Sequence, residues 1–470
     1  MLFNSFAYAI FFPSTVALYF AIPHRWRWAW LLGASCLFYL AFIPAFIAIL
    51  AFTIVIDYGS GLLIEQASGG SRKAFLAASL VSNVLVLGTF KYFNFASETL
   101  TLLLGHLGIQ VNLPLLTMVL PIGLSFHTFQ SMSYTIEVYR GHIRAERHFG
   151  IFALYVMFFP QLVAGPIERP QNLLEQFRTP VTFNYDRAIS GLQLMIWGLL
   201  KKVVIADSIA TAVDRAFNAP STCSASALVL AVYLFAIQIY CDFSGYSDIA
   251  IGSAQILGIR LMTNFERPYA ADSLPDFWRR WHISLSTWFR DYVYVPLGGN
   301  RRHRLRNLLV VFLVSGLWHG ANWTFVVWGG LHAAFMIVST KRRPGTAIPS
   351  RRIARIAHVV LTFHLVALAW IFFRAATVPQ ALSFIARIGH APFFSSDPLQ
   401  ELGLPRFQRL IVGTSLLFLA MNEFSRRPRF LFEWFKERPL VIRWGVYYAA
   451  ILAIVLTSGG GPRQFIYFQF

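Results

Sequence analysis

The sequence has 470 residues, of which 56% are hydrophobic and 13% charged, and its mean hydropathy is +0.56. Soluble domains carry about a quarter charged residues, so this composition excludes an ordinary soluble protein and indicates one that lies in a lipid bilayer. The net charge of +19 comes from basic residues gathered in short loops, which the positive-inside rule explains better than nucleic-acid binding does.

Largely apolar runs that reach or approach the length of a bilayer crossing recur along the chain. They are 6–22, 42–63, 74–93, 149–163, 225–240, 359–373 and 441–456. With weaker segments added, we predict about ten to twelve crossings within one integral-membrane domain that covers 1–470. The first run has neither a basic segment before it nor a small-residue cleavage site, so we expect a retained span rather than a signal peptide.

Two stretches in the first half of the chain combine membrane-like hydropathy with polar side chains. VLPIGLSFHTFQSMSYTIEVYRG (119–141) contains His127 and Glu137, and QLVAGPIERP (161–170) ends an apolar run with a Gly-Pro break and a charged pair. A polar connector follows. Residues 187–216 are then expected to form an amphipathic helix that includes GLLKKVVIAD.

YCDFSGYSDIAIG (240–252) puts Asp242 and Asp248 among apolar neighbours. The small residues of this stretch suit close helix packing. The aspartates have two interpretations, which are pairing with buried arginine as structural support and direct participation in chemistry. The structural interpretation is favoured.

SLPDFWRRWHISLSTWFRDYVY (273–294) has the pattern of one amphipathic helix, which begins at the signature formed by Ser273, Pro275 and Asp276. At about 100° per residue, one face gathers Trp278, Trp281, His282, Leu285, Trp288, Phe289 and Tyr292. The opposite face gathers Arg279, Arg280, Ser284, Ser286, Thr287, Arg290 and Asp291. A helix at the membrane interface explains most of this pattern. Because such a helix has no use for His282, we expect that side chain to point toward protein or a cavity.

GLWHGANWTF (316–325) places a titratable ring midway along the almost wholly apolar stretch 307–340. One straight helix of that length would measure about 50 Å against a hydrocarbon core of about 30 Å, whereas two full spans would need more residues. We therefore predict a bent or re-entrant helix pair, broken near HGAN, in which Gly316 and Gly320 allow close helix approach. His319 would then lie within the membrane but away from lipid. Asn322 would hydrogen-bond a neighbouring backbone group or the imidazole.

His319 has a structural and a functional interpretation. A lone histidine in a span is more often a satisfied core residue, but His282, Asp242 and Asp248 in the same part of the chain favour a functional site. An unperturbed pKa near about 6.5 suits histidine as a proton acceptor. Neither H-E-x-x-H nor comparable spacing is found, so we expect no catalytic metal. The cysteines predict neither a disulfide framework nor a thiolate metal site, and they are Cys36, Cys223 and Cys241.

Together these motifs resemble the membrane-bound O-acyltransferase (MBOAT) family, in particular its bacterial branch that contains alginate O-acetyltransferase. The matching stretches occur in order over nearly the whole chain, with a core at about 119–340. They are LPIGLSFHTFQSMSYTIEVYRG, QLVAGPIERP, QIYCDFSGYSDIAIG, DFWRRWHISLSTWFRDYVYVPLGGNR, LWHGANWTFVVWG and FIYFQF. Cys241 is a departure, because an aromatic residue is expected there.

The resemblance implies an all-α membrane protein whose spans, with re-entrant and amphipathic helices, surround a central funnel or tunnel. It implies that acetyl-CoA donates from the cytoplasm without a tightly bound cofactor. The acetyl group would pass to an exported polysaccharide beside a periplasmic or membrane-anchored acetyltransferase partner, at the bacterial inner membrane. The family's active-site histidine corresponds to His319 and its second prominent histidine to His282. Supporting roles fall to Trp318, Asn322, Asp242 and Asp248, and the CoA phosphates are expected at Arg279 and Arg280.

In this hypothesis His319 is a general base, and an acyl-histidine or acyl-tyrosine relay is an alternative. Alginate is the leading acceptor, and cellulose, other exopolysaccharides and peptidoglycan are alternatives. A carrier-protein thioester, as in D-alanylation of teichoic acids, is the alternative donor. A transporter or lipid flippase is a remote alternative, because the sequence shows neither internal repeats nor paired broken helices.

Overall fold

The computed structural model describes residues 1–117, 121–163, 165–341, 352–392, 394–395, 397–425, 437–458 and 463–468. Every regular element in these ranges is a helix, which confirms the all-α prediction. The chain forms two compact units, each described by itself below. Unit 1 comprises Met1–Met195 and Ile249–Met262, and unit 2 comprises Ile196–Asp248 and Thr263–Phe470.

Unit 1 contains the first ten α-helices, the last of them in part, and the end of α12 (Ala225–Ile256). The helices are α1 (Phe6–Ala21), α2 (His24–Leu40), α3 (Phe46–Gln66), α4 (Gly69–Leu87), η1 (Gly88–Tyr92), α5 (Phe93–His106), α6 (Leu124–Arg140), α7 (Phe149–Met157), α8 (Phe159–Leu162), α9 (Pro170–Arg178) and α10 (Tyr185–Leu199). The apolar run at 149–163 is therefore two short helices rather than one span. The break falls at Phe158, two residues before Pro160, which has no backbone N–H to continue the hydrogen bonds of α7 and is tolerated in the first turn of α8.

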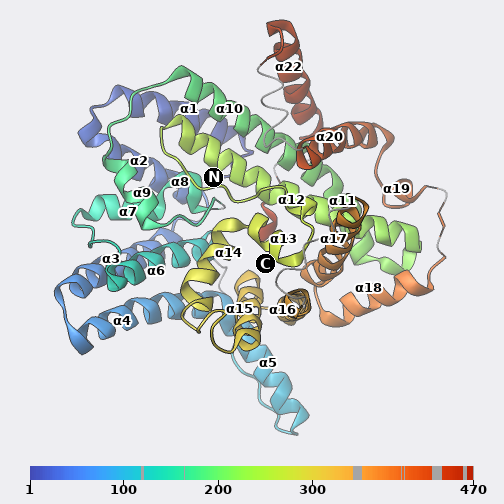
Figure 1. The fold of residues 1–470 in the computed structure, drawn as a ribbon, viewed down its shortest axis with the longest axis horizontal. Helices are drawn as coiled ribbons and strands as arrows, with labels where there is room; N and C mark the ends of the chain where they lie inside the picture. The colour runs from blue at the N-terminus through green and yellow to red at the C-terminus, as the bar shows by residue number, and fades with distance from the viewer. Residues whose placement is uncertain are drawn as a thin grey trace. The chain divides into compact units, whose positions relative to one another are not determined.

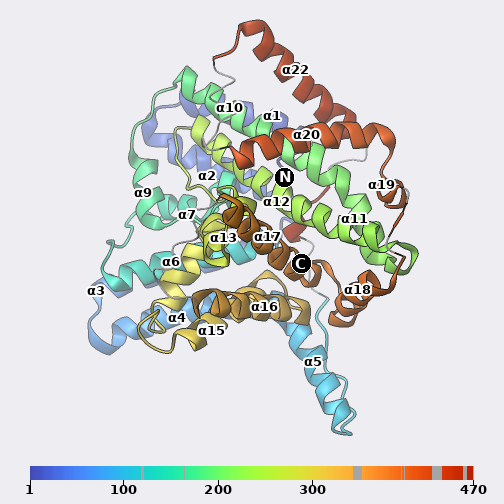
Figure 2. The ribbon, with the colours of Figure 1, turned by 45° about the vertical axis from the view of Figure 1, so that its right-hand side comes forward.

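A buried carboxylate joins three helices of unit 1. Figure 1 and Figure 2 show α3, α4 and α6 side by side. Asp57 of α3 is fully buried and accepts hydrogen bonds from Ser79 Oγ at 2.6 Å, from Asn83 Nδ2 at 2.9 Å and from Ser131 Oγ. A charge in an apolar bundle needs such partners, so this network fixes which helix faces meet.

We expect Asp57→Ala to destabilise the protein by about 3 kcal/mol, because it leaves buried donors on two neighbouring helices without their acceptor. The apparent melting temperature of the purified protein in detergent measures this effect. Glu98→Ala is the matched control, because Glu98 is an exposed carboxylate on α5. Equal melting temperatures for the two variants would contradict the assigned role of the network.

Unit 2 contains the rest of α10, the first part of α12 and the elements between and after these two helices. They are η2 (Leu200–Asp207), α11 (Ser208–Asn218), η3 (Pro220–Thr222), η4 (Pro268–Ala270), α13 (Leu274–Arg280), α14 (Ile283–Phe289), η5 (Arg290–Tyr294), α15 (Arg304–His319), α16 (Trp323–Lys341), α17 (Arg352–Arg374), α18 (Val378–His390), α19 (Pro398–Glu401), α20 (Arg406–Phe424), α22 (Leu440–Thr457) and η6 (Ile466–Phe468). The predicted helix over 187–216 is confirmed as the continuous run α10–η2–α11, with a π-helical turn in its middle.

Six helical segments among the described residues are long and apolar enough to cross a membrane. They are Phe46–Gln66, Gly69–His106, Tyr185–Asn218, Ala225–Ile256, Ile353–Arg374 and Leu440–Thr457, and two shorter apolar helices are Phe6–Ala21 and Trp323–Ser339. The chain is therefore a multi-pass membrane protein. Length and composition alone do not test the predicted total of ten to twelve crossings, which stays a prediction.

The predicted helix pair broken near HGAN is confirmed. Helices α15 and α16 form an antiparallel hairpin, visible in Figure 1 and Figure 2, whose turn covers 320–322. A Cβ at Gly316 would lie 2.2 Å from the carbonyl oxygen of Phe325, and one at Gly329 would lie 2.3 Å from that of Phe312. Glycine is required at both positions because the two backbones touch there.

Gly329→Ala is expected to lower the melting temperature, because the added methyl group would force the two helices apart at a cost of about 1–3 kcal/mol. Gly330→Ala is the matched control on the next residue, where a Cβ meets no atom within 4 Å. That substitution should leave stability unchanged or raise it by about 0.5–1 kcal/mol, because alanine favours helix more than glycine does. Equal effects of the two substitutions would argue against close packing of the hairpin.

Candidate active site

His319 is the last residue of α15 and is buried, with 4% of its surface exposed. Four aromatic rings surround its imidazole at centroid distances of 5.0 Å (Trp318), 5.0 Å (Trp328), 5.3 Å (Phe373) and 5.5 Å (Tyr467). These rings come from α15, α16, α17 and the segment 463–468. The predicted placement of His319 away from lipid is thus confirmed, in an environment that strengthens electrostatic interactions.

His282 does not lie within a helix, so the predicted single helix over 273–294 is wrong. Helices α13 and α14 are seven residues each, and His282 separates them with a left-handed backbone (φ 44°). Because of this break the helical wheel fails beyond His282, and Ser284, assigned to the polar face, is fully buried. The expectation that His282 points into protein is confirmed, since its side chain has no exposed surface.

A hydrogen-bonded cluster around Asn264 holds His282 in place. Asn264 Oδ1 lies 3.1 Å from His282 Nδ1 and accepts from the backbone N–H of Ser284 at 3.2 Å and its hydroxyl at 2.9 Å. Because the backbone N–H of Ser284 can only donate, it fixes Oδ1 of Asn264 as the acceptor, and the amide nitrogen then donates to Ser247 Oγ at 3.2 Å. His282 therefore carries its proton on Nδ1. Burial lowers the pKa of His282 to about 3, so the ring is neutral at physiological pH.

Trp318 lies between the two candidate histidines. Its ring centroid is 5.0 Å from that of His319 and 6.1 Å from that of His282. The structure thus brings together the two histidines and Trp318, which the sequence assigned to one site. Asn322 instead serves the backbone, since its Nδ2 donates to Ala376 O at 2.8 Å and its Oδ1 accepts from Thr324 N–H at 3.0 Å. Of the two roles predicted for Asn322, the structure shows the contact with backbone.

Asp242 and Asp248 both pair with lysine, where the sequence analysis expected arginine. Asp242 lies 2.5 Å from Lys202 Nζ, and Asp248 lies 2.6 Å from Lys201 Nζ, both on the π-helical turn η2. Both aspartates are therefore members of ion pairs, and their assignment to structural support rather than to direct chemistry stays a prediction. Asp242 also accepts from the backbone N–H of Ile466 at 2.7 Å, which links it to the segment that contains Tyr467.

The arginines predicted to hold CoA phosphates lie at the end of α13. Arg280 pairs with Asp276 at 2.9 Å, and Arg279 is exposed. Neither arginine contacts the two histidines in the geometry described above, so their role stays a prediction. Among the described residues, no cluster of His, Cys, Asp or Glu could hold a metal ion.

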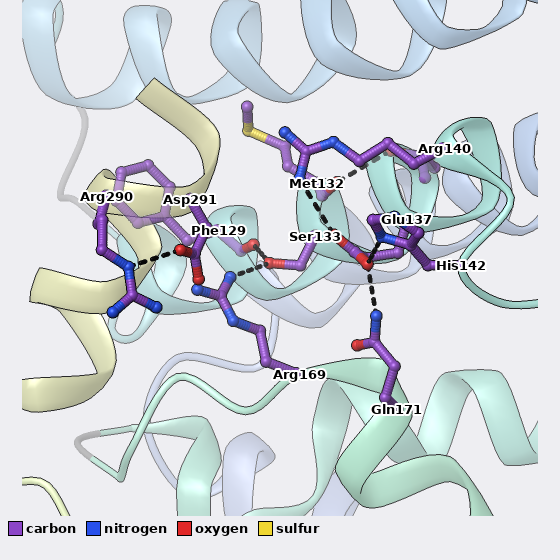
Figure 3. Close-up of polar contacts among 11 residues, drawn as sticks. Phe129, Met132, Ser133, Glu137, Arg140, His142, Arg169, Gln171, Arg290 and Asp291 are labelled. Carbon is purple, nitrogen blue, oxygen red and sulfur yellow. Dashed lines mark hydrogen bonds and ion pairs between the residues drawn. The ribbon is translucent and has the colours of Figure 1, made fainter. Parts of the chain in front are cut away.

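A second polar cluster lies in unit 1, where the EVYRG and PIERP motifs meet. Figure 3 shows Glu137, at the end of α6, facing Arg140, His142 and Gln171. His142 Nδ1 lies 2.8 Å from Glu137, Arg140 Nη1 lies 3.4 Å from it, and Gln171 donates to it. The nearby Arg169 donates to Ser133 Oγ at 3.5 Å, and within unit 2 Arg290 pairs with Asp291 at 2.7 Å (Figure 3). Arg169 of the PIERP motif is therefore hydrogen-bonded to α6.

Sequence reasoning missed three parts of the site. Tyr467 was noted only within the motif FIYFQF, and Asn264 was not singled out. The Lys201–Lys202 doublet was noted only as part of a predicted amphipathic helix, although both lysines are buried. Two adjacent lysines within a run apolar enough to span a membrane were the available signal, because such charges need buried partners.

Comparison with known proteins shows which family and which enzymes this chain is similar to. The family described as MBOAT, membrane-bound O-acyltransferase, matches residues 109–378, which include both candidate histidines. The probable alginate O-acetylase of Azotobacter vinelandii is 39% identical over 415 residues, which cover 87% of this chain and 81% of that protein. The same enzyme of Pseudomonas aeruginosa is 39% identical over 432 residues, 89% of this chain and 81% of that protein.

Two further relatives have other printed activities. The peptidoglycan O-acetyltransferase of Helicobacter pylori is 36% identical over 386 residues, 76% of this chain and 72% of that protein. The teichoic acid D-alanyltransferase of Bacillus subtilis is 27% identical over 332 residues, 67% of this chain and 81% of that protein. All of these relatives are named as enzymes that move an acyl group, although their acceptors differ.

Proposed function

Because this chain belongs to the membrane-bound O-acyltransferase family and is an acyltransferase, we propose that it acetylates hydroxyl groups of an exported polysaccharide at the expense of acetyl-CoA. The observation that supports this proposal most directly is His319, a buried imidazole inside an aromatic enclosure built by three helices and the segment 463–468. The proposal places the chain in the inner membrane of a bacterium. A periplasmic or membrane-anchored acetyltransferase would complete delivery to the polymer.

His319 acts as general base in this proposal. It takes the proton of the attacking hydroxyl while the oxygen forms a bond to the thioester carbonyl carbon. The C–S bond then breaks, and the departing CoA thiolate takes the proton back from His319, so the atoms and charges balance within one cycle. General-base help supplies about 10²–10⁴-fold, and positioning of the reactants must supply much of the rest.

Tyr467 supports the covalent variant of this reaction. Its ring lies 5.5 Å from that of His319, and burial raises the pKa of Tyr467, so the phenol keeps its proton at neutral pH. A protonated phenol needs a base before it can attack a thioester, and His319 is the base beside it. In this variant Tyr467 receives the acetyl group first and passes it to the partner or the acceptor.

His282 and Arg279 have subordinate roles in the proposal. With Nδ1 committed to Asn264, His282 presents Nε2 as a fixed hydrogen-bond acceptor that orients the reactants. Arg279 and Arg280 hold the CoA phosphates, because guanidinium groups match phosphate oxygens.

The names of two relatives give other acceptors. The peptidoglycan O-acetyltransferase is also named for transfer of an acetyl group to oxygen, and its identity to this chain is close to that of the alginate enzymes. Teichoic acid D-alanylation has a relative of lower identity, so a carrier-protein donor is the less favoured alternative.

We expect the purified protein in nanodiscs to release free CoA from acetyl-CoA, and His319→Ala to lose about 10²–10⁴-fold of that rate. A thiol-reactive dye follows the release. His390→Ala is the matched control, because His390 is an exposed histidine at the end of α18. Wild-type release by His319→Ala would contradict the base assignment, and release only from an acyl carrier protein would favour the alternative donor.

Tyr467→Phe is expected to abolish acetyl transfer in the covalent variant, because it removes one oxygen atom and leaves the aromatic packing intact. Incubation of the wild type with acetyl-CoA alone should leave an acetyl adduct on the peptide that contains Tyr467, detected by mass spectrometry. Full transfer activity in Tyr467→Phe, with no adduct in the wild type, would favour direct attack by the acceptor hydroxyl.

A further inference from the structure

The segment 463–468 is held in unit 2 by its main chain. The backbone N–H of Ile466 donates to Asp242 Oδ2 at 2.7 Å, and the backbone carbonyl of Gln464 accepts from Lys202 Nζ at 3.3 Å. Lys202 and Asp242 pair with each other at 2.5 Å, and their side chains are only 1% and 3% exposed. The ion pair therefore offers one acceptor and one donor to the backbone of the segment.

Aromatic side chains of the segment pack on both sides of this attachment. Phe465 is fully buried, with its ring centroid 5.3 Å from that of Phe243 and 4.7 Å from that of Tyr246. Tyr467 lies 4.6 Å from Phe243 and 5.5 Å from His319. Holding Ile466 by its N–H thus fixes the place of Tyr467, the next residue along the chain.

The ion pair and the segment depend on each other. Lys202 also lies 2.9 Å from Asp207, so one ammonium group faces two carboxylates. Buried charges are stable only where further hydrogen bonds satisfy them, and the segment provides one donor and one acceptor for this purpose. Because these are main-chain groups, the attachment specifies where the segment lies and leaves its side chains available for other contacts.

We propose that Lys202 and Asp242 are positioning residues that hold the segment 463–468 so that Tyr467 lies against His319. The inference rests on the proposed function for its link to catalysis, but the attachment itself can be measured without any activity. Neither residue touches the imidazole in the contacts described above, so both act through the segment.

The adjacent Lys201 provides a matched control. It is also buried, pairs with Asp248 at 2.6 Å and donates to Ser244 Oγ at 2.8 Å. Loss of its charge disturbs an ion pair on the same π-helical turn without removing a bond to the segment.

The experiment is hydrogen exchange followed by mass spectrometry on the full chain in nanodiscs, combined with CoA-release kinetics. Three variants test the attachment: Lys202→Met removes the ammonium group, Asp242→Asn removes the charge of the acceptor, and Ile466→Pro removes the N–H donor, with Ile466→Val as the control for the changed side chain. Ile466 begins a 3-10 turn, where proline is tolerated, so this variant keeps both charged side chains and is compatible with the turn.

We expect the peptide containing 463–468 to exchange at least about tenfold faster in all three variants, with α15 and α16 unchanged. The kcat for CoA release should fall by about 10²-fold while the KM for acetyl-CoA stays within about twofold, because misplacement affects the reacting groups and not donor binding. Lys201→Met should leave exchange of the segment as in the wild type, and so should Ile466→Val, which keeps the N–H.

Unchanged exchange of the segment in Ile466→Pro, or a wild-type kcat despite faster exchange, would overturn the inference. Faster exchange of the segment in Lys201→Met equal to that in Lys202→Met would also overturn it, because the effect would then be a general one of lost charge. A wild-type protein that releases no CoA would remove the proposed function instead, and the exchange result would still decide whether the attachment exists.

Discussion

The ion pair between Lys202 and Asp242 is the interaction on which the candidate site depends. Removing two charges from water costs several kcal/mol for each ion, and their attraction repays that cost only when the remaining donors and acceptors are satisfied. Asp207 and the backbone of 463–468 provide this satisfaction. The same contacts bring Tyr467 to His319, so a requirement of electrostatics also assembles the groups proposed to react.

Unit 1 meets the same requirement in another way. Asp57 has no lysine or arginine among the partners described above and is surrounded by hydroxyl and amide donors of α4 and α6. In a chain that is mostly apolar, hydrophobic contact alone does not distinguish one helix face from another, because lipid offers similar surroundings. Buried polar groups therefore specify which faces meet, and the two units use neutral donors in one case and an ion pair in the other.

Local patterns made the helical hairpin and the burial of His319 predictable. The length of the apolar stretch, the polar interruption at HGAN and the glycine spacing all lie within 307–340, and each acts through nearby residues. The break at His282 was not predictable in this way. Its left-handed backbone is held by Asn264, a residue outside the predicted helix, so a wheel drawn at a constant angle put Ser284 on the wrong face. The pairing of Asp242 with Lys202 was likewise not predictable from local patterns, because the two residues are far apart in the sequence.

The two candidate histidines differ in how far their surroundings determine their chemistry. The hydrogen bond that His282 Nδ1 donates to Asn264 Oδ1 fixes the tautomer and orientation of His282, which suits a residue that orients others. His319 is instead enclosed by aromatic rings from α15, α16 and α17 and by the ring of Tyr467. A general base must take a proton and return it within one catalytic cycle, so a proton donor has to lie next to it. The phenol of Tyr467, brought there by a bond to the backbone of its neighbour, is the group already beside it.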